Sequence, residues 1–166
     1  MDQLSIRDEI EELNKECKGH EKLSEVNKYV WKTIIGKIED KFIHKQHYSE
    51  GMHWGWQRLK EPQYVLSLVV APERYLQFFV NDELIWFIVE DYQNKMWLYE
   101  GYTSFIRKVI PELVHLREYY IISKKYEWLL CVNHHGIVFG SGAELVAKMK
   151  KFEQINPEEV IKRNPQ

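Results

Sequence analysis

Apolar residues in the second half of the chain gather in short runs that have the length and composition of β-strands. Leu84 to Val89 and Met96 to Tyr99 form one pair of runs, and Tyr119 to Ile122 and Tyr126 to Val132 form another. Aromatic and branched side chains dominate both pairs, and a short polar segment joins the runs of each pair, which predicts two antiparallel hairpins. Within the last run only Glu127 is polar, so the pattern indicates an interior strand that is covered on both faces.

The segment after the second hairpin combines a turn, a strand and a helix start. Asn133 to Gly136 supplies the asparagine and glycine of a tight turn, and Ile137 to Phe139 follows as a further strand. Ser141 and Glu144 have the spacing of a capping box, which predicts a helix that begins there with Ser141 as its cap.

The N-terminal part of the chain has helical periodicity. Apolar residues recur every three or four positions over residues 5 to 18 and again from Ser24 to Phe42, which predicts two amphipathic helices. Their short connection predicts a helical hairpin that either lies on the sheet or forms a lid over it. After an aperiodic loop over residues 43 to 53, Trp54 and Trp56 alternate with a small and a polar residue, and an extended strand would place both indoles on one side.

The remaining segments complete a prediction of the fold class. They are a strand from Tyr64 to Val70, a short helix from Glu73 to Phe79, a helix from Thr103 to Ile110 and a C-terminal helix over residues 156 to 164. We therefore predict an α+β fold, in which an N-terminal helical hairpin precedes a mainly antiparallel sheet of about five or six strands with helices packed on it. The prediction is a single domain over residues 1–166, with the hairpin at 1–42 and the α+β core at 54–152.

Charge and apolar length argue against several classes of protein. The 23 basic and 25 acidic residues give a formal net charge of −2, so the chain lacks the basic footprint of proteins that bind nucleic acid or an anionic membrane surface. No apolar run approaches the ~20 residues that span a bilayer, and the acidic N-terminus does not resemble a signal peptide, so we expect a cytoplasmic protein. Cys17 and Cys131 lie in unrelated patterns, which indicates neither a disulfide framework nor a zinc ribbon.

The candidate binding residues are histidines and tryptophans close to predicted turns. His134 and His135 follow a buried strand, and with Glu127 or Asp91 they could move protons or bind a metal. Zinc sites usually show wider ligand spacings than two adjacent histidines, so we predict no metal and no cofactor and assign the pair to a turn or an interface. An exposed pair such as Trp54 and Trp56 would anchor a protein partner. The predicted binding residues are therefore His134, His135, Trp54, Trp56 and Glu127.

Carboxylates also gather where predicted strands end. Glu90 and Asp91 follow one strand and Glu100 ends the next, so they come to the same edge of the sheet. Paired acids can do general acid and base work when their surroundings separate their pKa values. Acidic strand ends are more often solvated turns, and the sequence leaves both alternatives open.

Three segments resemble a known family. They are Trp86 to Asp91 (WFIVED), Trp97 to Gly101 (WLYEG) and Lys125 to His135 (KYEWLLCxNHH). Over roughly the C-terminal two-thirds, the chain resembles a family of small bacterial proteins of unknown function, and this resemblance implies no catalytic residues. In its organisation the chain also resembles α+β immunity proteins of the Smi1/Knr4 type, which neutralise polymorphic toxins.

Two functions from different classes are consistent with these observations. The first is a cytosolic protein-binding module, in the form of an immunity (antitoxin-like) protein, because the chain lacks catalytic signatures and is rich in large aromatic side chains. The alternative is a small metal-dependent or acid/base hydrolase that uses His134, His135 and nearby carboxylates. Only the first hypothesis implies a protein partner. Neither hypothesis implies a particular oligomeric state.

Overall fold

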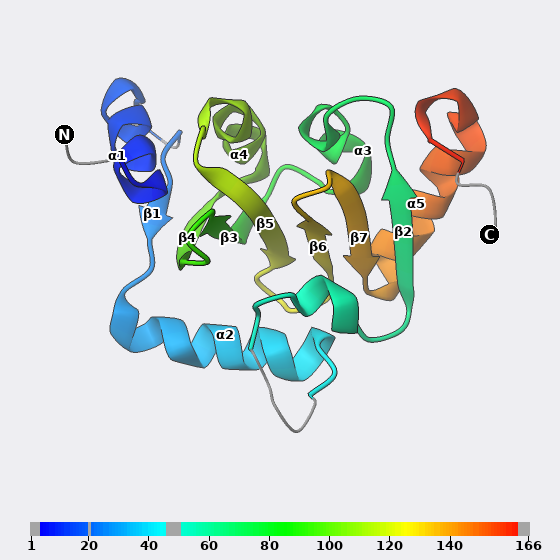
Figure 1. Ribbon diagram of the computed structural model, residues 1–166, viewed down its shortest axis with the longest axis horizontal. Helices are drawn as coiled ribbons and strands as arrows, with labels where there is room; N and C mark the ends of the chain where they lie inside the picture. Colours follow the sequence, from blue (N-terminus) through cyan, green and yellow to red (C-terminus); the bar gives the residue numbers. More distant parts are fainter. Residues whose placement is uncertain (1–3, 20, 46–50, 163–166) are drawn as a thin grey trace.

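An antiparallel sheet of seven strands runs through the centre of the molecule (Figure 1). The computed structural model describes residues 4–19, 21–45 and 51–162. The strand order in the sheet is β1-β4-β3-β5-β6-β7-β2. The strands are β1 (Ser24–Glu25), β2 (Gln63–Ser67), β3 (Leu84–Asp91), β4 (Met96–Tyr102), β5 (Leu116–Ser123), β6 (Leu129–Val132) and β7 (Ile137–Ser141). The helices are α1 (Ile6–Glu16), α2 (Lys28–Phe42), α3 (Leu76–Phe79), α4 (Thr103–Val109) and α5 (Ala143–Ile155), with 3₁₀ turns η1 (Gly55–Arg58), η2 (Pro72–Arg74), η3 (Ile110–Glu112) and η4 (Pro157–Glu159).

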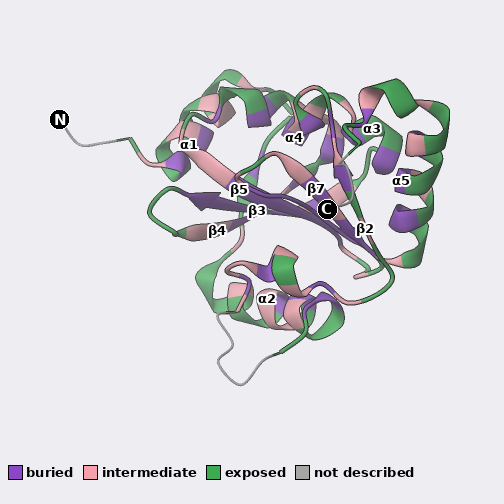
Figure 2. Ribbon diagram, turned by 45° about the vertical axis from the view of Figure 1, so that its right-hand side comes forward, coloured by how far each residue is buried: buried purple, intermediate pink, exposed green. Residues whose placement is uncertain are grey.

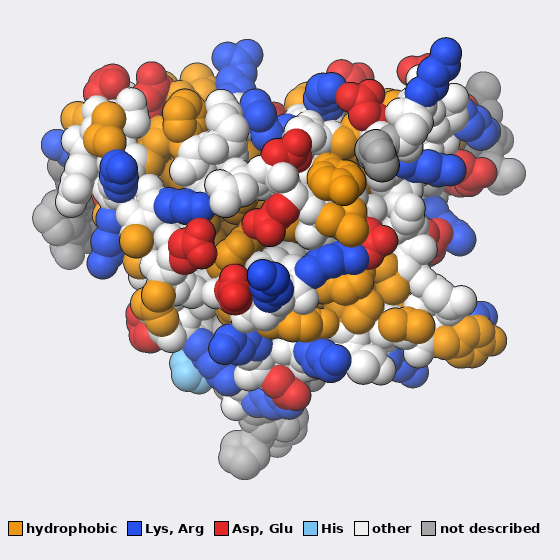
Figure 3. Space-filling view, turned by 180° about the vertical axis from the view of Figure 1, so that it is seen from behind, with side chains coloured by type: hydrophobic (Ala, Val, Ile, Leu, Met, Phe, Trp, Pro, Cys, Tyr) orange, Lys and Arg blue, Asp and Glu red, His pale blue; other side chains and the backbone are white. Residues whose placement is uncertain are grey.

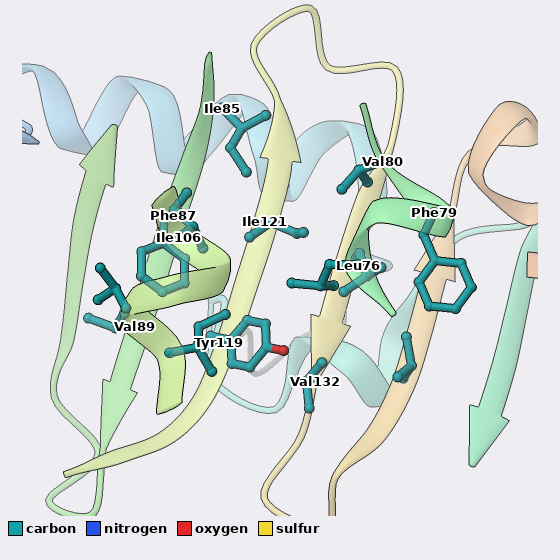
Figure 4. Packing of buried hydrophobic residues seen from close by; sticks show 14 of the residues in the cluster. Leu76, Phe79, Val80, Ile85, Phe87, Val89, Ile106, Tyr119, Ile121 and Val132 are labelled. Atoms are coloured by element: carbon teal, nitrogen blue, oxygen red, sulfur yellow. The ribbon is translucent and has the colours of Figure 1, made fainter. Parts of the chain in front are cut away.

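Both faces of the sheet are covered, so the strands carry two hydrophobic cores (Figure 2). Helices α1, α3, α4 and α5 lie on one face, and Figure 4 shows side chains of neighbouring strands meeting those of α3 and α4 there. Helix α2 and the segment that leads into η1 cover the other face. Successive strand residues alternate between the two cores, as Phe87 and Ile88 do in β3. This double cover explains why the strand segments are apolar without alternation.

The predicted α+β class and both hairpins are confirmed. Strands β3 and β4 pair antiparallel, as do β5 and β6, and β6 lies between β5 and β7 with all of its residues buried. Trp128, Leu130 and Val132 share one core, as the alternation predicts. Gly136 has the positive φ of +71° that its place in the turn requires.

The prediction of an N-terminal helical hairpin is wrong, because α1 and α2 lie on opposite faces of the sheet. Strand β1 separates them and adds an edge strand beside β4, which raises the strand count above the predicted five or six. The buried Leu23 leads into this strand, and the Asn14 side chain binds both its backbone N–H and its carbonyl oxygen, at 2.9 and 2.8 Å. Two strand residues are too few to show period-two alternation, so the helical pattern around them concealed the strand.

Three local predictions also differ from the structure. Trp54 and Trp56 do not lie on a strand, because Trp54 has a left-handed backbone with φ of 57° and the η1 turn follows it. Ser141 does not cap α5: its hydroxyl donates to the Lys60 carbonyl oxygen at 2.8 Å, and Gly142 occupies the cap position. The C-terminal helix expected over residues 156 to 164 is the single turn η4, and residues 163 to 166 lie outside the described part of the chain.

The surface carries both signs of charge. Lys and Arg side chains intermingle with Asp and Glu side chains on the face seen in Figure 3, as the near-neutral composition leads one to expect. In the described ranges, none of the helices is long and apolar enough to cross a membrane.

Candidate functional site

Two buried glutamates on neighbouring strands form the centre of the candidate site. Glu90 of β3 and Glu118 of β5 are directly paired in the sheet. Glu90 lies two positions after Ile88 in β3, and Glu118 lies two positions before Tyr120 in β5. Residues two apart in a strand share a face, so both glutamate side chains point to the face that α2 covers. Glu90 is 1% and Glu118 3% exposed. Two carboxylates in such surroundings require cationic or hydrogen-bonding partners, or a shared proton.

Glu118 holds the imidazole of His134. Its Oε1 accepts from the backbone N–H of His134 at 3.3 Å and lies 2.6 Å from Nδ1 of the same residue. This double contact fixes the orientation of the ring and favours a proton on Nδ1. Nε2 of a side chain that remains 23% exposed is then left for another interaction.

Glu90 has weaker partners. Its Oε1 lies 3.3 Å from His53 Nδ1 and 3.7 Å from an Arg117 guanidinium nitrogen. Its Oε2 is buried without a hydrogen-bond partner among the described residues. Burial, and next the neighbouring charge of Glu118, raises the pKa of Glu90 to about 7, although Arg117 acts in the opposite direction. Glu90 can therefore exchange a proton near neutral pH.

Trp54 links the two glutamate–histidine pairs. Its ring centroid lies 5.6 Å from that of His53 and 5.6 Å from that of His134, in edge-on geometry with both. The Arg117 guanidinium lies 5.6 Å from the same ring. Trp56 is next to it, with its ring 5.9 Å from Trp54. Both indoles are half-buried.

Two anchors hold the segment that carries these tryptophans on the sheet. The Tyr120 hydroxyl of β5 donates to the Met52 carbonyl oxygen at 3.2 Å. The Arg58 guanidinium donates to the carbonyl oxygens of Gly51 and His53, at 2.8 and 3.3 Å. The short segment therefore has a fixed place without belonging to a regular strand.

The turn after β6 presents the second histidine. The Asn133 side-chain oxygen accepts from the backbone N–H groups of His135 and Ile137, each at 3.0 Å. This asparagine turn directs His135 into solvent, with its ring centroid 3.9 Å from that of His134. We call the surface formed by His53, Trp54, Trp56, His134 and His135 the aromatic–histidine face.

The structure brings together four of the five predicted binding residues, namely Trp54, Trp56, His134 and His135. The fifth, Glu127, is exposed and precedes β6, whereas the histidines follow it, so they lie at opposite ends of that strand.

The strand-end carboxylates have separate surroundings. Glu90 belongs to the site, whereas the Asp91 side chain binds backbone N–H groups of its own turn and Glu100 pairs with Lys124. The sequence pattern did not identify three further residues of the site, His53, Arg117 and Glu118. Glu118 could have been found from its spacing, because an acid two positions before Tyr120 in the same strand lies on the same face as that tyrosine.

The arrangement can orient an imidazole and hold a proton. His134 on its buried carboxylate has the form of a general base that is oriented by a second group. Across the described ranges, no three His, Cys, Asp or Glu side chains are arranged as metal ligands.

Comparisons with known proteins add a family and no activity. Residues 2–153 match DUF6756, which is described as a family of unknown function. Neither the curated proteins nor the solved structures contain a match to the chain.

Proposed function

Because the chain belongs to the DUF6756 family of unknown function, we propose its role from the site itself: a cytosolic protein-binding module that contacts its partner through the aromatic–histidine face. The observation that carries this proposal is the geometry of Trp54. Its half-buried indole is held between His53 and His134 on a left-handed backbone. Tryptophan is among the residue types that dominate binding energy at interfaces.

The backbone of Trp54 supports a functional interpretation over a purely structural one. A bulky residue at φ of 57° is strained by about 1–3 kcal/mol, whereas glycine would adopt that conformation freely. Such outliers concentrate at functional sites, where the surrounding structure enforces them. The carbonyl anchors on Met52 and His53 supply that enforcement here.

Rigidity also favours recognition. Binding costs free energy whenever mobile side chains become ordered, so a surface that is already ordered binds more tightly for the same contacts. Glu118 orients His134, and the two rings beside Trp54 restrict the indole. The exposed His135 then belongs to the polar rim around this anchor.

For the partner, we propose a toxin-like protein, which would make this chain an immunity protein. Support comes from the resemblance in organisation to Smi1/Knr4-type immunity proteins and from the mixed surface charge, which favours a protein over nucleic acid. Co-expression with the product of a neighbouring toxin-like gene tests this form of the proposal. Rescue of growth by the wild-type chain supports it, and toxicity that the chain does not relieve contradicts it.

Site-specific cross-linking tests the binding surface even while the partner is unidentified. A photo-reactive amino acid at position 135 is expected to capture one dominant protein in the native cell, and the same amino acid at position 127 is the control. Both positions are exposed and lie at opposite ends of β6. Equal capture at both positions, or capture at 127 alone, contradicts the proposal.

A second candidate function is acid–base hydrolysis by the Glu118–His134 pair. The observation that favours it is the 2.6 Å contact between a buried carboxylate and the histidine Nδ1, which prepares Nε2 to take a proton from water. Purified protein would be assayed against carboxylic and phosphoric esters, with His134→Ala and His135→Ala as a matched pair. Hydrolysis lost only in His134→Ala supports this alternative, and equal rates in all three proteins exclude it.

A further inference from the structure

A pocket of about 310 Å³ adjoins the aromatic–histidine face between α2 and the β3–β4 hairpin. Trp31 and Ile35 line it from one face of α2, since residues four apart in a helix are neighbours. Ile88 and Met96 line it from the sheet, where they lie on adjacent strands. This volume is at the lower end of the range for ligand pockets, which suits one small molecule and is too small for a nucleotide cofactor.

The lining defines the chemistry of the occupant. Trp31 offers an indole, and Met52 and Met96 offer polarisable thioethers that contact aromatic rings favourably. Among the described lining residues none is a lysine or arginine, so the pocket offers no counter-charge to a phosphate or carboxylate. These surfaces fit an uncharged aromatic ring.

The polar lining of the pocket comes from His53 and Asn94, and buried Glu90 stands behind His53. Ile88 and Glu90 occupy alternate positions of β3 on the same face, and Met96 is the cross-strand partner of Glu90. The carboxylate is therefore the next side chain along the pocket floor, 3.3 Å from His53 Nδ1. An ionised Glu90 favours a proton on Nδ1, which makes Nε2 a hydrogen-bond acceptor.

We propose that this pocket binds a small molecule made of one aromatic ring with a single hydroxyl or ring N–H donor. The ring packs against Trp31 and Met96, and the donor bonds to Nε2 of His53. The pocket adjoins the surface proposed for the protein partner and shares His53 with it. Buried hydrogen-bonding sites reject analogues that lack the donor, so the pocket should distinguish a phenol from the same ring without its hydroxyl.

Titration with matched probes tests this site. Binding of p-cresol, with toluene as the analogue that lacks the hydroxyl, would be followed by amide chemical shifts of the isotope-labelled full chain. We expect p-cresol to bind at least ~10-fold more tightly than toluene, which corresponds to about 1.4 kcal/mol. The shifts should centre on Ile35 and Met96.

Two variants separate the ring from the donor contact. Ile35→Trp fills the pocket from a half-buried position and should abolish binding of both probes. His53→Phe should remove the preference for p-cresol while toluene still binds. A tyrosine-containing peptide, added as a third probe, identifies the source of the phenol.

Several outcomes would overturn the proposal. They are no saturable binding of p-cresol, equal affinity for p-cresol and toluene, shifts that persist in a folded Ile35→Trp variant, or binding of the peptide alone. None of these results bears on cross-linking at position 135, so the pocket and the partner surface can fail independently.

Discussion

Replacement of Glu90 with glutamine is expected to stabilise the protein above pH 7 and to have a much smaller effect near pH 5. Glu90 is 1% exposed, and its pKa of about 7 lies well above the ordinary value of 4.5. The folded protein therefore binds this proton more tightly than the unfolded chain, so the contribution of Glu90 to stability declines as pH rises from about 4.5 through 7. A separation of about 2.5 between the two pKa values corresponds to about 3 kcal/mol once the group is fully ionised.

Glutamine keeps the shape of the protonated acid and cannot ionise. The difference in unfolding free energy between Glu90→Gln and the wild type should therefore grow from just under about 1 kcal/mol at pH 5 to about 3 kcal/mol at pH 8. Urea unfolding of both proteins at four pH values between 5 and 8 measures it, because contributions from groups remote from the site cancel in the difference. A flat difference, or a variant less stable than the wild type at pH 8, would refute the reasoning about this carboxyl.

Four further substitutions probe the site and its scaffold. His134→Ala should lower the free energy of unfolding by about 1–3 kcal/mol, because it leaves buried Glu118 without its imidazole partner. His135→Ala, at the exposed neighbour, should change that free energy by no more than about 0.5 kcal/mol. Equal effects of the two substitutions in denaturant unfolding would contradict this. Trp128→Ala should cost about 3–5 kcal/mol from the core, and an unchanged unfolding midpoint would mean that the core is misplaced. Gly142→Ala should cost more than about 1 kcal/mol, because φ is +108° and a Cβ would meet a backbone carbonyl oxygen at 2.4 Å; a thermal midpoint equal to that of the wild type would contradict it.

The central strands could be predicted because their signal is strong and local. The apolar runs around Trp86 and Trp128, joined by polar turns, predict β3 to β6 and the antiparallel pairing within each hairpin. The pairing of β3 with β5, which joins the two hairpins, has no such local signal. Strand β1 could not be predicted in the same way, since two residues show no alternation and only their pairing with Glu100 and Tyr99 makes them a strand. The face that each N-terminal helix covers likewise depends on where β1 places the chain.

The candidate site was predicted in part, for a related reason. His134 and His135 were found from the turn signal, and the tryptophan pair from its spacing, although Trp54 and Trp56 meet through a left-handed residue and a 3₁₀ turn rather than a strand. The exposed Glu127 belonged to a misread run, because Tyr126 has a positive φ and the strand begins only at residue 129. Buried Glu118 depends on sheet register, which sequence spacing alone does not supply.

The affinity of the cross-linked partner for Trp54→Gly tests the central claim most directly. Glycine accepts the left-handed backbone, so this variant removes the indole without adding strain. Glu127→Ala, at the far end of β6, is the matched control. Calorimetric titration of the purified partner should show at least a ~10-fold loss of affinity for Trp54→Gly, equivalent to about 1.4 kcal/mol, and unchanged affinity for Glu127→Ala. Unchanged affinity of a folded Trp54→Gly variant would contradict the assignment of the aromatic–histidine face as the binding surface.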